Sequence, residues 1–114
     1  VAIYRAEAAL AHFASFGLDV PRLRAVSLRQ TRRILDGLDA RGLGSRVVTP
    51  REEARRGGFV AVRAPAAQSV VSTLRKRGVL VDARGEVVRL GPAPYLTDAE
   101  IDRGVSAFAD AVAL

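Results

Sequence analysis

The sequence VLVDARGEVVRLGPAPYL, residues 79–96, predicts a β-hairpin that continues into a rigid loop. Residues 79–81 are a short apolar run, residues 82–85 have the composition of a turn, and residues 86–90 return as a second strand. Arg89 therefore lies near the end of the second strand. The rest of the chain is interpreted as the support for this hairpin.

The segment after Arg89 makes this arginine a candidate binding residue. A guanidinium offers a planar fork of donors that matches a carboxylate. Proline restricts the backbone, so the following loop would hold a nearly constant shape beside the guanidinium. The sequence therefore predicts that Arg89 binds a carboxylate and that the supporting loop residues are Gly91, Pro92 and Pro94.

A second interpretation of Arg89 remains open at this point. An arginine on a sheet surface can simply pair with a nearby acid, and both Glu86 and Asp82 are within reach in the sequence. Asp82 and Arg84 flank the predicted turn, and we interpret them as an Asx-type turn with a local ion pair.

The other elements are predicted from apolar periodicity, caps, glycine and proline. The last helix begins with a capping box, Thr97 followed by Glu100, and carries a helical stripe. In chain order we expect a helix over 2–16, a long helix over 21–41, a short strand at 47–48, a strand over 59–63, a helix over 66–77, the hairpin, and a helix over 98–113.

The order α-α-β-α-β-β-α predicts an α+β fold, in which helices cover a small, mostly antiparallel sheet of three to four strands. Residues 1–44 would form two long helices that lead into the domain, and residues 45–114 would form its α+β core. Because the leading helices are long and rich in arginine, we expect them to pack away from the sheet.

Composition limits the class of protein. A chain of 114 residues, about half of them apolar, is long enough for one domain with a modest core. No apolar run approaches the length of a membrane span, and the N-terminus does not resemble a signal peptide. The absence of cysteine excludes disulfides and thiolate metal sites, and we expect a cytoplasmic location. The absence of methionine suggests that the chain begins inside a longer protein.

The charge of +6 comes from 17 arginines and one lysine, and it is concentrated in the middle of the chain. Residues 22–63 hold 11 basic and 4 acidic side chains. Such a block is typical either of a nucleic-acid surface or of a solvated helical face whose acidic counterpart lies on another part of the protein. Phe59 is the only aromatic residue on a predicted strand, so base stacking has little support and we expect no nucleic-acid partner.

Few residues in the chain could carry out catalysis. The single histidine, His12, lies on a predicted helix and is interpreted as structural, and a zinc site is not expected. The single lysine, Lys76, lies near a helix end between two arginines and is interpreted as solvated, not as a Schiff-base residue. We find no P-loop, Rossmann fingerprint or nucleophile elbow. The sequence therefore predicts no catalytic, cofactor-binding or metal-binding residue.

Three segments together carry a family resemblance: RGGFVAVR at 56–63, LRKRGVLVDAR at 74–84 and VRLGPAP at 88–94. They resemble the C-terminal part of kynureninases, which belong to the class V aminotransferase group of fold-type-I pyridoxal-phosphate enzymes. The similarity extends over nearly the whole chain. One departure follows Pro94, where this chain has Tyr-Leu-Thr and the family usually has Leu-Tyr-Asn.

The resemblance implies that this chain is the small C-terminal domain of a longer, pyridoxal-phosphate-dependent enzyme of tryptophan catabolism. Arg89 matches the family arginine that holds the substrate α-carboxylate. The cofactor lysine and most phosphate ligands would belong to a large domain upstream in the same polypeptide, and a homodimer is expected. The implied reaction is hydrolysis of kynurenine to anthranilate and alanine.

Two alternatives remain open. The departure after Pro94 leaves room for another class V member, such as an aminotransferase, a cysteine desulfurase or a β-lyase. The second alternative is a stand-alone basic α+β binding module.

Overall fold

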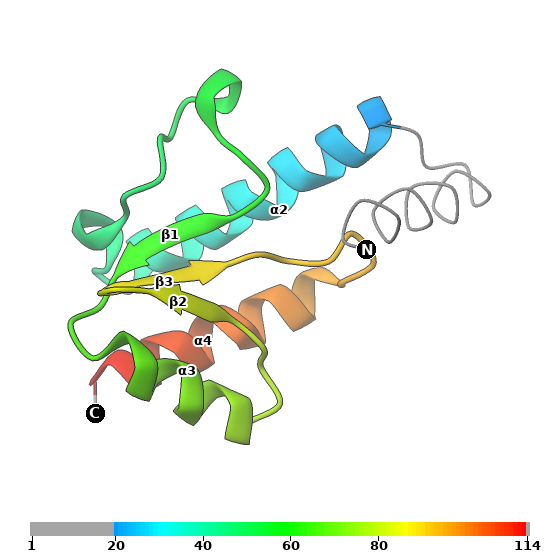
Figure 1. Cartoon of the computed structure of the whole chain (residues 1–114). Helices are drawn as coiled ribbons and strands as arrows, with labels where there is room; N and C mark the ends of the chain where they lie inside the picture. Colours follow the sequence, from blue (N-terminus) through cyan, green and yellow to red (C-terminus); the bar gives the residue numbers. More distant parts are fainter. Residues whose placement is uncertain (1–19, 114) are drawn as a thin grey trace, which may run out of the picture.

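Helices and a three-stranded sheet alternate along the chain in the computed structural model, which describes residues 20–113 (Figure 1). The predicted α+β class is confirmed. The predicted helix over 2–16, with His12, lies outside the described residues. None of the described helices has the length and apolarity needed to cross a bilayer. The elements are α2 (Val20–Ala40), the 3₁₀ turns η1 (Gly44–Arg46) and η2 (Glu53–Arg55), β1 (Val60–Arg63), α3 (Ala67–Lys76), β2 (Asp82–Arg84), β3 (Val87–Leu90) and α4 (Asp98–Ala113).

The sheet is antiparallel, with the order β1-β3-β2, so β3 is its central strand. Because side chains alternate across a strand, Val88 and Leu90 point toward the helices while Arg89 points to the opposite face. The register pairs Arg89 with Ala61 on one side and with Asp82 on the other. The expected strand at 47–48 is reduced to a single bridge between Val47 and Val62.

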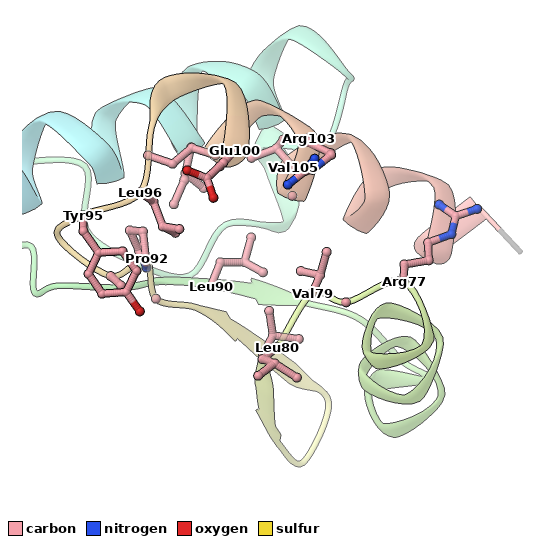
Figure 2. Close-up of a pocket in the computed structure, with 17 residues that line it drawn as sticks. Arg77, Val79, Leu80, Leu90, Pro92, Tyr95, Leu96, Glu100, Arg103 and Val105 are labelled. Carbon is pink, nitrogen blue, oxygen red and sulfur yellow. The ribbon is translucent and has the colours of Figure 1, made fainter.

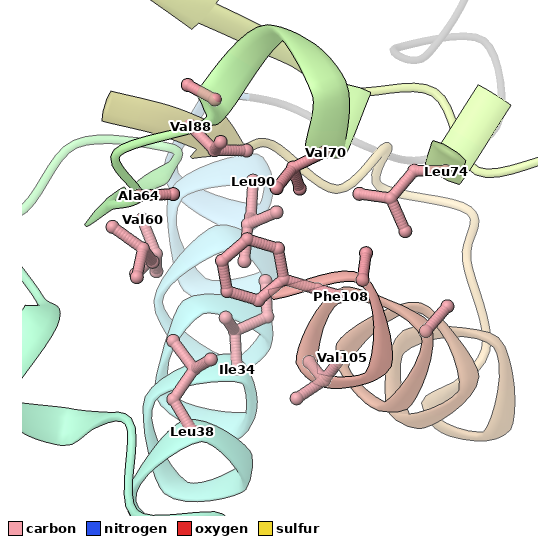
Figure 3. Packing of buried hydrophobic residues seen from close by; sticks show 14 of the residues in the cluster. Ile34, Leu38, Val60, Ala64, Val70, Leu74, Val88, Leu90, Val105 and Phe108 are labelled. Carbon is pink, nitrogen blue, oxygen red and sulfur yellow. The ribbon is translucent and has the colours of Figure 1, made fainter. Parts of the chain in front are cut away.

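One hydrophobic core joins the inner face of the sheet to helices α2, α3 and α4. Phe108 of α4 is fully buried, and its ring lies among Leu90 of the sheet, Ile34 of α2 and Val70 of α3 (Figure 3). The predicted stripe on α4 is confirmed, because its inward positions fill this core. They are Ile101, Val105 and Phe108, with Val112 partly buried at the margin.

The long helix α2 belongs to this same core, so the expectation that it packs away from the sheet is wrong. Ile34 and Leu38 are buried against the sheet and α4. Gly37 explains how closely α2 approaches α4: a Cβ atom at this position would lie only 3.1 Å from Cγ1 of Val105. The glycine that weakens the helix locally therefore permits a close helix–helix contact.

The hairpin lies further along the chain than the sequence predicts. Residues 79–81 are not its first strand, because Gly78 and Val79 end helix α3. The amide of Gly78 donates to the carbonyl of Arg75, and the amide of Val79 donates to the carbonyl of Leu74, as in a Schellman motif. The first strand is instead β2, which places Asp82 in the sheet and not in a turn.

The hairpin turn consists of Gly85 and Glu86, between the paired residues Arg84 and Val87. Gly85 has a φ of 58°, and no non-glycine residue described has a positive φ. This is the pattern of a type II′ turn, whose twist matches that of the flanking strands. The two-residue turn fixes the register, and the register brings Asp82 opposite Arg89.

The capping box at the start of α4 forms as the sequence predicts. The amide of Glu100 donates to the Thr97 hydroxyl at 3.2 Å, and the Thr97 amide donates to Oε1 of Glu100 at 3.1 Å. We expect Thr97→Ala to lower the free energy of unfolding by about 1 kcal/mol, because an amide of the first turn loses its acceptor. Urea denaturation measures this, with Thr97→Ser as the control that keeps the hydroxyl. An alanine variant as stable as the parent would contradict the assignment of the cap.

Candidate carboxylate-binding site

Arg89 lies on the open face of the sheet and is held by the carboxylate of Asp82. Nε of Arg89 donates to Oδ1 of Asp82 at 2.7 Å, and Nη2 donates to Oδ2 at 2.5 Å. This bidentate hydrogen bonding lowers the pKa of the Asp82 carboxyl below its usual range, so the pair is charged at neutral pH. Of the two acids considered from the sequence, Asp82 is the partner of Arg89 and Glu86 is not.

A third residue, Phe59, limits the position of the guanidinium. The central carbon of the Arg89 guanidinium lies 5.7 Å from the centroid of the Phe59 ring, within the range of a cation–π contact. Nη1 has no hydrogen-bonding partner among the described residues. The edge formed by Nη1 and Nη2 therefore still has N–H donors to offer.

A shallow cleft of about 330 Å³ opens beside this guanidinium. Its wall combines the charged pair with apolar side chains, and the Arg89 side chain is about 30% exposed. A small ligand with one carboxylate and an apolar part would match such a surface. The lining residues are Phe59, Leu80, Val81, Asp82, Arg89 and Gly91.

A larger groove of about 710 Å³ adjoins the first cleft and shares three of its lining residues, Leu80, Val81 and Gly91. Figure 2 shows Leu80 on one side of this groove, Tyr95 and Leu96 at one end, and Glu100 of α4 above. Leu80 and Tyr95 are 79% and 75% exposed, which is unusual for large side chains of low polarity. The groove next to the Arg89 cleft therefore exposes two large side chains of low polarity.

The proline-rich loop is tied to helix α2 by a residue that the sequence did not single out. Gln30 is 2% exposed, and its side-chain amide donates to the carbonyl of Ala93 at 2.8 Å. Ala93 lies between Pro92 and Pro94, so this bond anchors the centre of the predicted supporting loop. A polar residue one turn before Ile34, on the buried face of α2, was the signal that could have identified Gln30.

A second unpredicted residue, Arg56, is buried with 2% exposure. Its guanidinium donates to the Thr31 hydroxyl at 2.8 Å, to the Arg51 carbonyl at 2.8 Å and to the Leu28 carbonyl at 3.1 Å. These bonds fasten the segment before β1 to α2. The sequence interpretation places this arginine on a solvated face, although it is the first residue of the family-like segment at 56–63.

Arg29 and Arg33 of α2 find acidic partners on α4 of this chain. Arg33 makes two hydrogen bonds to Asp102 of α4, at 2.7 and 2.8 Å, and Arg29 donates to Asp98 at 3.0 Å. The interpretation that placed the acidic counterpart on another part of the protein is therefore wrong for these residues. This pairing could not be predicted from the sequence, because the paired residues of α2 and α4 are 69 positions apart.

Three other residues considered from the sequence, Lys76, Arg84 and Glu86, line neither cleft. Lys76, the only lysine of the chain, is exposed in the last turn of α3 and lines neither cleft. Arg84 is exposed in β2, and Glu86 is exposed in the hairpin turn. Of the four residues predicted for the site, Gly91 lines both clefts, Pro92 lines the larger one and Pro94 is half-buried beside them.

The family model for the kynureninase C-terminal domain matches residues 23–108, a segment that begins in α2 and includes the whole sheet and Arg89. The chain belongs to the kynureninase C-terminal domain family. Among curated proteins, none matches the chain. The family is pyridoxal-phosphate dependent, and the family assignment accounts for the three sequence segments that resemble kynureninases.

Among the described residues, the two clefts offer no amine to which pyridoxal phosphate could be attached. Covalent attachment of pyridoxal phosphate requires a lysine amine in the site. The exposed Lys76 lines neither of the clefts around Arg89. Within the described residues, the domain provides a guanidinium and apolar walls, which can bind and orient a substrate.

Proposed function

We propose that this chain is the substrate-orienting domain of a kynureninase-type enzyme, in which Arg89 binds the α-carboxylate of the amino-acid substrate. The observation that carries the proposal is the guanidinium of Arg89 beside an open cleft, with its Nη1 edge unpartnered among the described residues. Its position in the family-matched segment supports the same role.

In the intact enzyme the proposed reaction is hydrolytic cleavage of the Cβ–Cγ bond of kynurenine, giving anthranilate and alanine. Pyridoxal phosphate supplies the electron sink for such chemistry. A large domain of the same polypeptide would hold that cofactor, and a second subunit would complete a homodimer. This chain would fix one end of the substrate, because a salt-bridged carboxylate restricts both the position and the rotation of the amino acid.

The apolar side chains beside the guanidinium support this role. Phe59, Leu80 and Val81 line the cleft that Arg89 shares, and they would contact the apolar part of a bound amino acid. The loop containing Pro92 and Pro94 would keep this wall of the cleft in place, since Gln30 anchors it to α2.

The test is Arg89→Lys in the full-length enzyme. We expect kcat/KM for kynurenine to fall by about tenfold or more, because an ammonium cannot make two parallel bonds to a carboxylate. Steady-state kinetics measures this. The matched control is Arg84→Lys, an exposed arginine on the neighbouring strand, which should leave kcat/KM unchanged. If kcat/KM of the Arg89→Lys variant stays within about twofold of the parent value, the proposed clamp is wrong.

A further inference from the structure

Arg89 is held on two sides before any substrate arrives. Asp82 takes Nε and one hydrogen of Nη2, and the Phe59 ring lies 5.7 Å from the guanidinium carbon. A guanidinium carries five N–H donors in a fixed plane. Two of them face Asp82, and the outer edge retains a parallel pair, one N–H on Nη1 and one on Nη2.

From this geometry we infer that Asp82 is a positioning residue, which holds the Nε edge of Arg89 so that the Nη1–Nη2 edge receives the substrate carboxylate. The inference rests on the proposed function, since it assumes that Arg89 binds that carboxylate. Two carboxylates, one from the protein and one from the ligand, would then share a single guanidinium without competing for the same donors.

The backbone around Asp82 suits a positioning role. Asp82 and Arg89 are direct cross-strand partners in the hairpin, so the distance between their Cα atoms is set by the ladder of hydrogen bonds. On the other side of Arg89 the cross-strand partner is Ala61, whose side chain is too small to fix a guanidinium. Within the sheet, Asp82 is therefore the neighbour that determines where the end of the Arg89 side chain lies.

A competing role for Asp82 makes the opposite prediction. If Asp82 blocked Arg89, its removal would free donors and would also remove a negative charge near the ligand, so that an anion would bind more tightly. If Asp82 positions Arg89, its removal leaves a long side chain free to rotate, and carboxylate binding weakens despite the favourable change in charge. The sign of the effect therefore distinguishes the two roles.

The experiment compares two competitive inhibitors of the full-length enzyme, L-alanine and L-alaninamide, which differ in the carboxylate. The measured quantity is the ratio of their inhibition constants, alaninamide over alanine, which reports recognition of the carboxylate alone. We expect Asp82→Ala to reduce this ratio by about fivefold or more and Asp82→Asn to reduce it less, because asparagine keeps an oxygen acceptor for Arg89. In an Arg89→Ala background, Asp82→Ala should have no further effect.

The control is Glu86→Ala, which removes an exposed carboxylate from the turn of the same hairpin and should leave the ratio unchanged. Should Asp82→Ala fail to fold, Asp82→Asn carries the test, because it keeps the shape of the side chain. A ratio that is unchanged or increased in the Asp82 variants, while Arg89→Ala lowers it, overturns the positioning role and leaves the proposed function intact. A ratio that Arg89→Ala does not change contradicts the proposed function itself.

Discussion

Phe108→Ala is expected to lower the free energy of unfolding by about 3–5 kcal/mol, the usual cost of removing a fully buried aromatic ring. Phe108 has no exposed surface, and its ring fills the space among the sheet, α2 and α3 (Figure 3). The loss has two parts, the transfer energy of the ring and the cavity that the rigid surroundings leave behind. Urea denaturation of the chain, followed by circular dichroism, measures the change.

The matched control for this variant is Phe59→Ala, the same substitution on the opposite face of the sheet. Phe59 is 42% exposed, so its removal should have a small effect on stability by comparison. Two equal losses would contradict the placement of the core on the helical face alone. Because Phe59 lies beside Arg89, this control variant also shows whether the aromatic ring matters for carboxylate binding while the fold stays intact.

Arg56→Met is expected to lower the free energy of unfolding by about 2–3 kcal/mol, because it removes three hydrogen bonds donated by a buried guanidinium. The side chain keeps its approximate length, but the Thr31 hydroxyl and the carbonyls of Leu28 and Arg51 lose the hydrogen bonds that Arg56 donates to them. Removing a buried charge offsets part of that loss. Urea denaturation measures the net change.

The control for Arg56 is Arg63→Met, at the exposed end of β1, which should change stability by no more than about 0.5 kcal/mol. A similar effect at both positions would show that the bonds of Arg56 contribute little. The bonds matter for the site as well, since Arg56 fastens the segment that leads to Phe59.

Several features of the fold could be predicted because they depend on residues close together in the sequence. The capping box joins Thr97 to Glu100, and the buried stripe on α4 repeats every three or four residues. Helix α3 and the glycine at its C-terminal end could be predicted for the same reason. Such contacts form within one or two helical turns, so the residues that make them appear side by side in the sequence.

The hairpin shows where this reasoning fails. An apolar run at 79–81 is typical of a strand, yet the chain there completes the cap of α3. A two-residue turn at Gly85 and Glu86 then sets the register. Propensity at short range cannot choose between two registers, whereas burial of one face of the sheet can. The pair of Asp82 and Arg89 follows from that register. From the sequence, Asp82 was therefore only one of two possible partners of Arg89.

The amino-acid sequence alone was sufficient for the α+β class, for most element boundaries and for the resemblance to kynureninases, whereas the binding role of Arg89 stays a prediction. These depend on local periodicity, on caps and on motif spacing. The folded chain was needed to show that Arg56 and Gln30 are buried, that α2 completes the core, and that Asp82 holds one edge of Arg89. Each of the two buried residues meets partners at least 25 residues away, at positions that exist only after the helices have packed on the sheet.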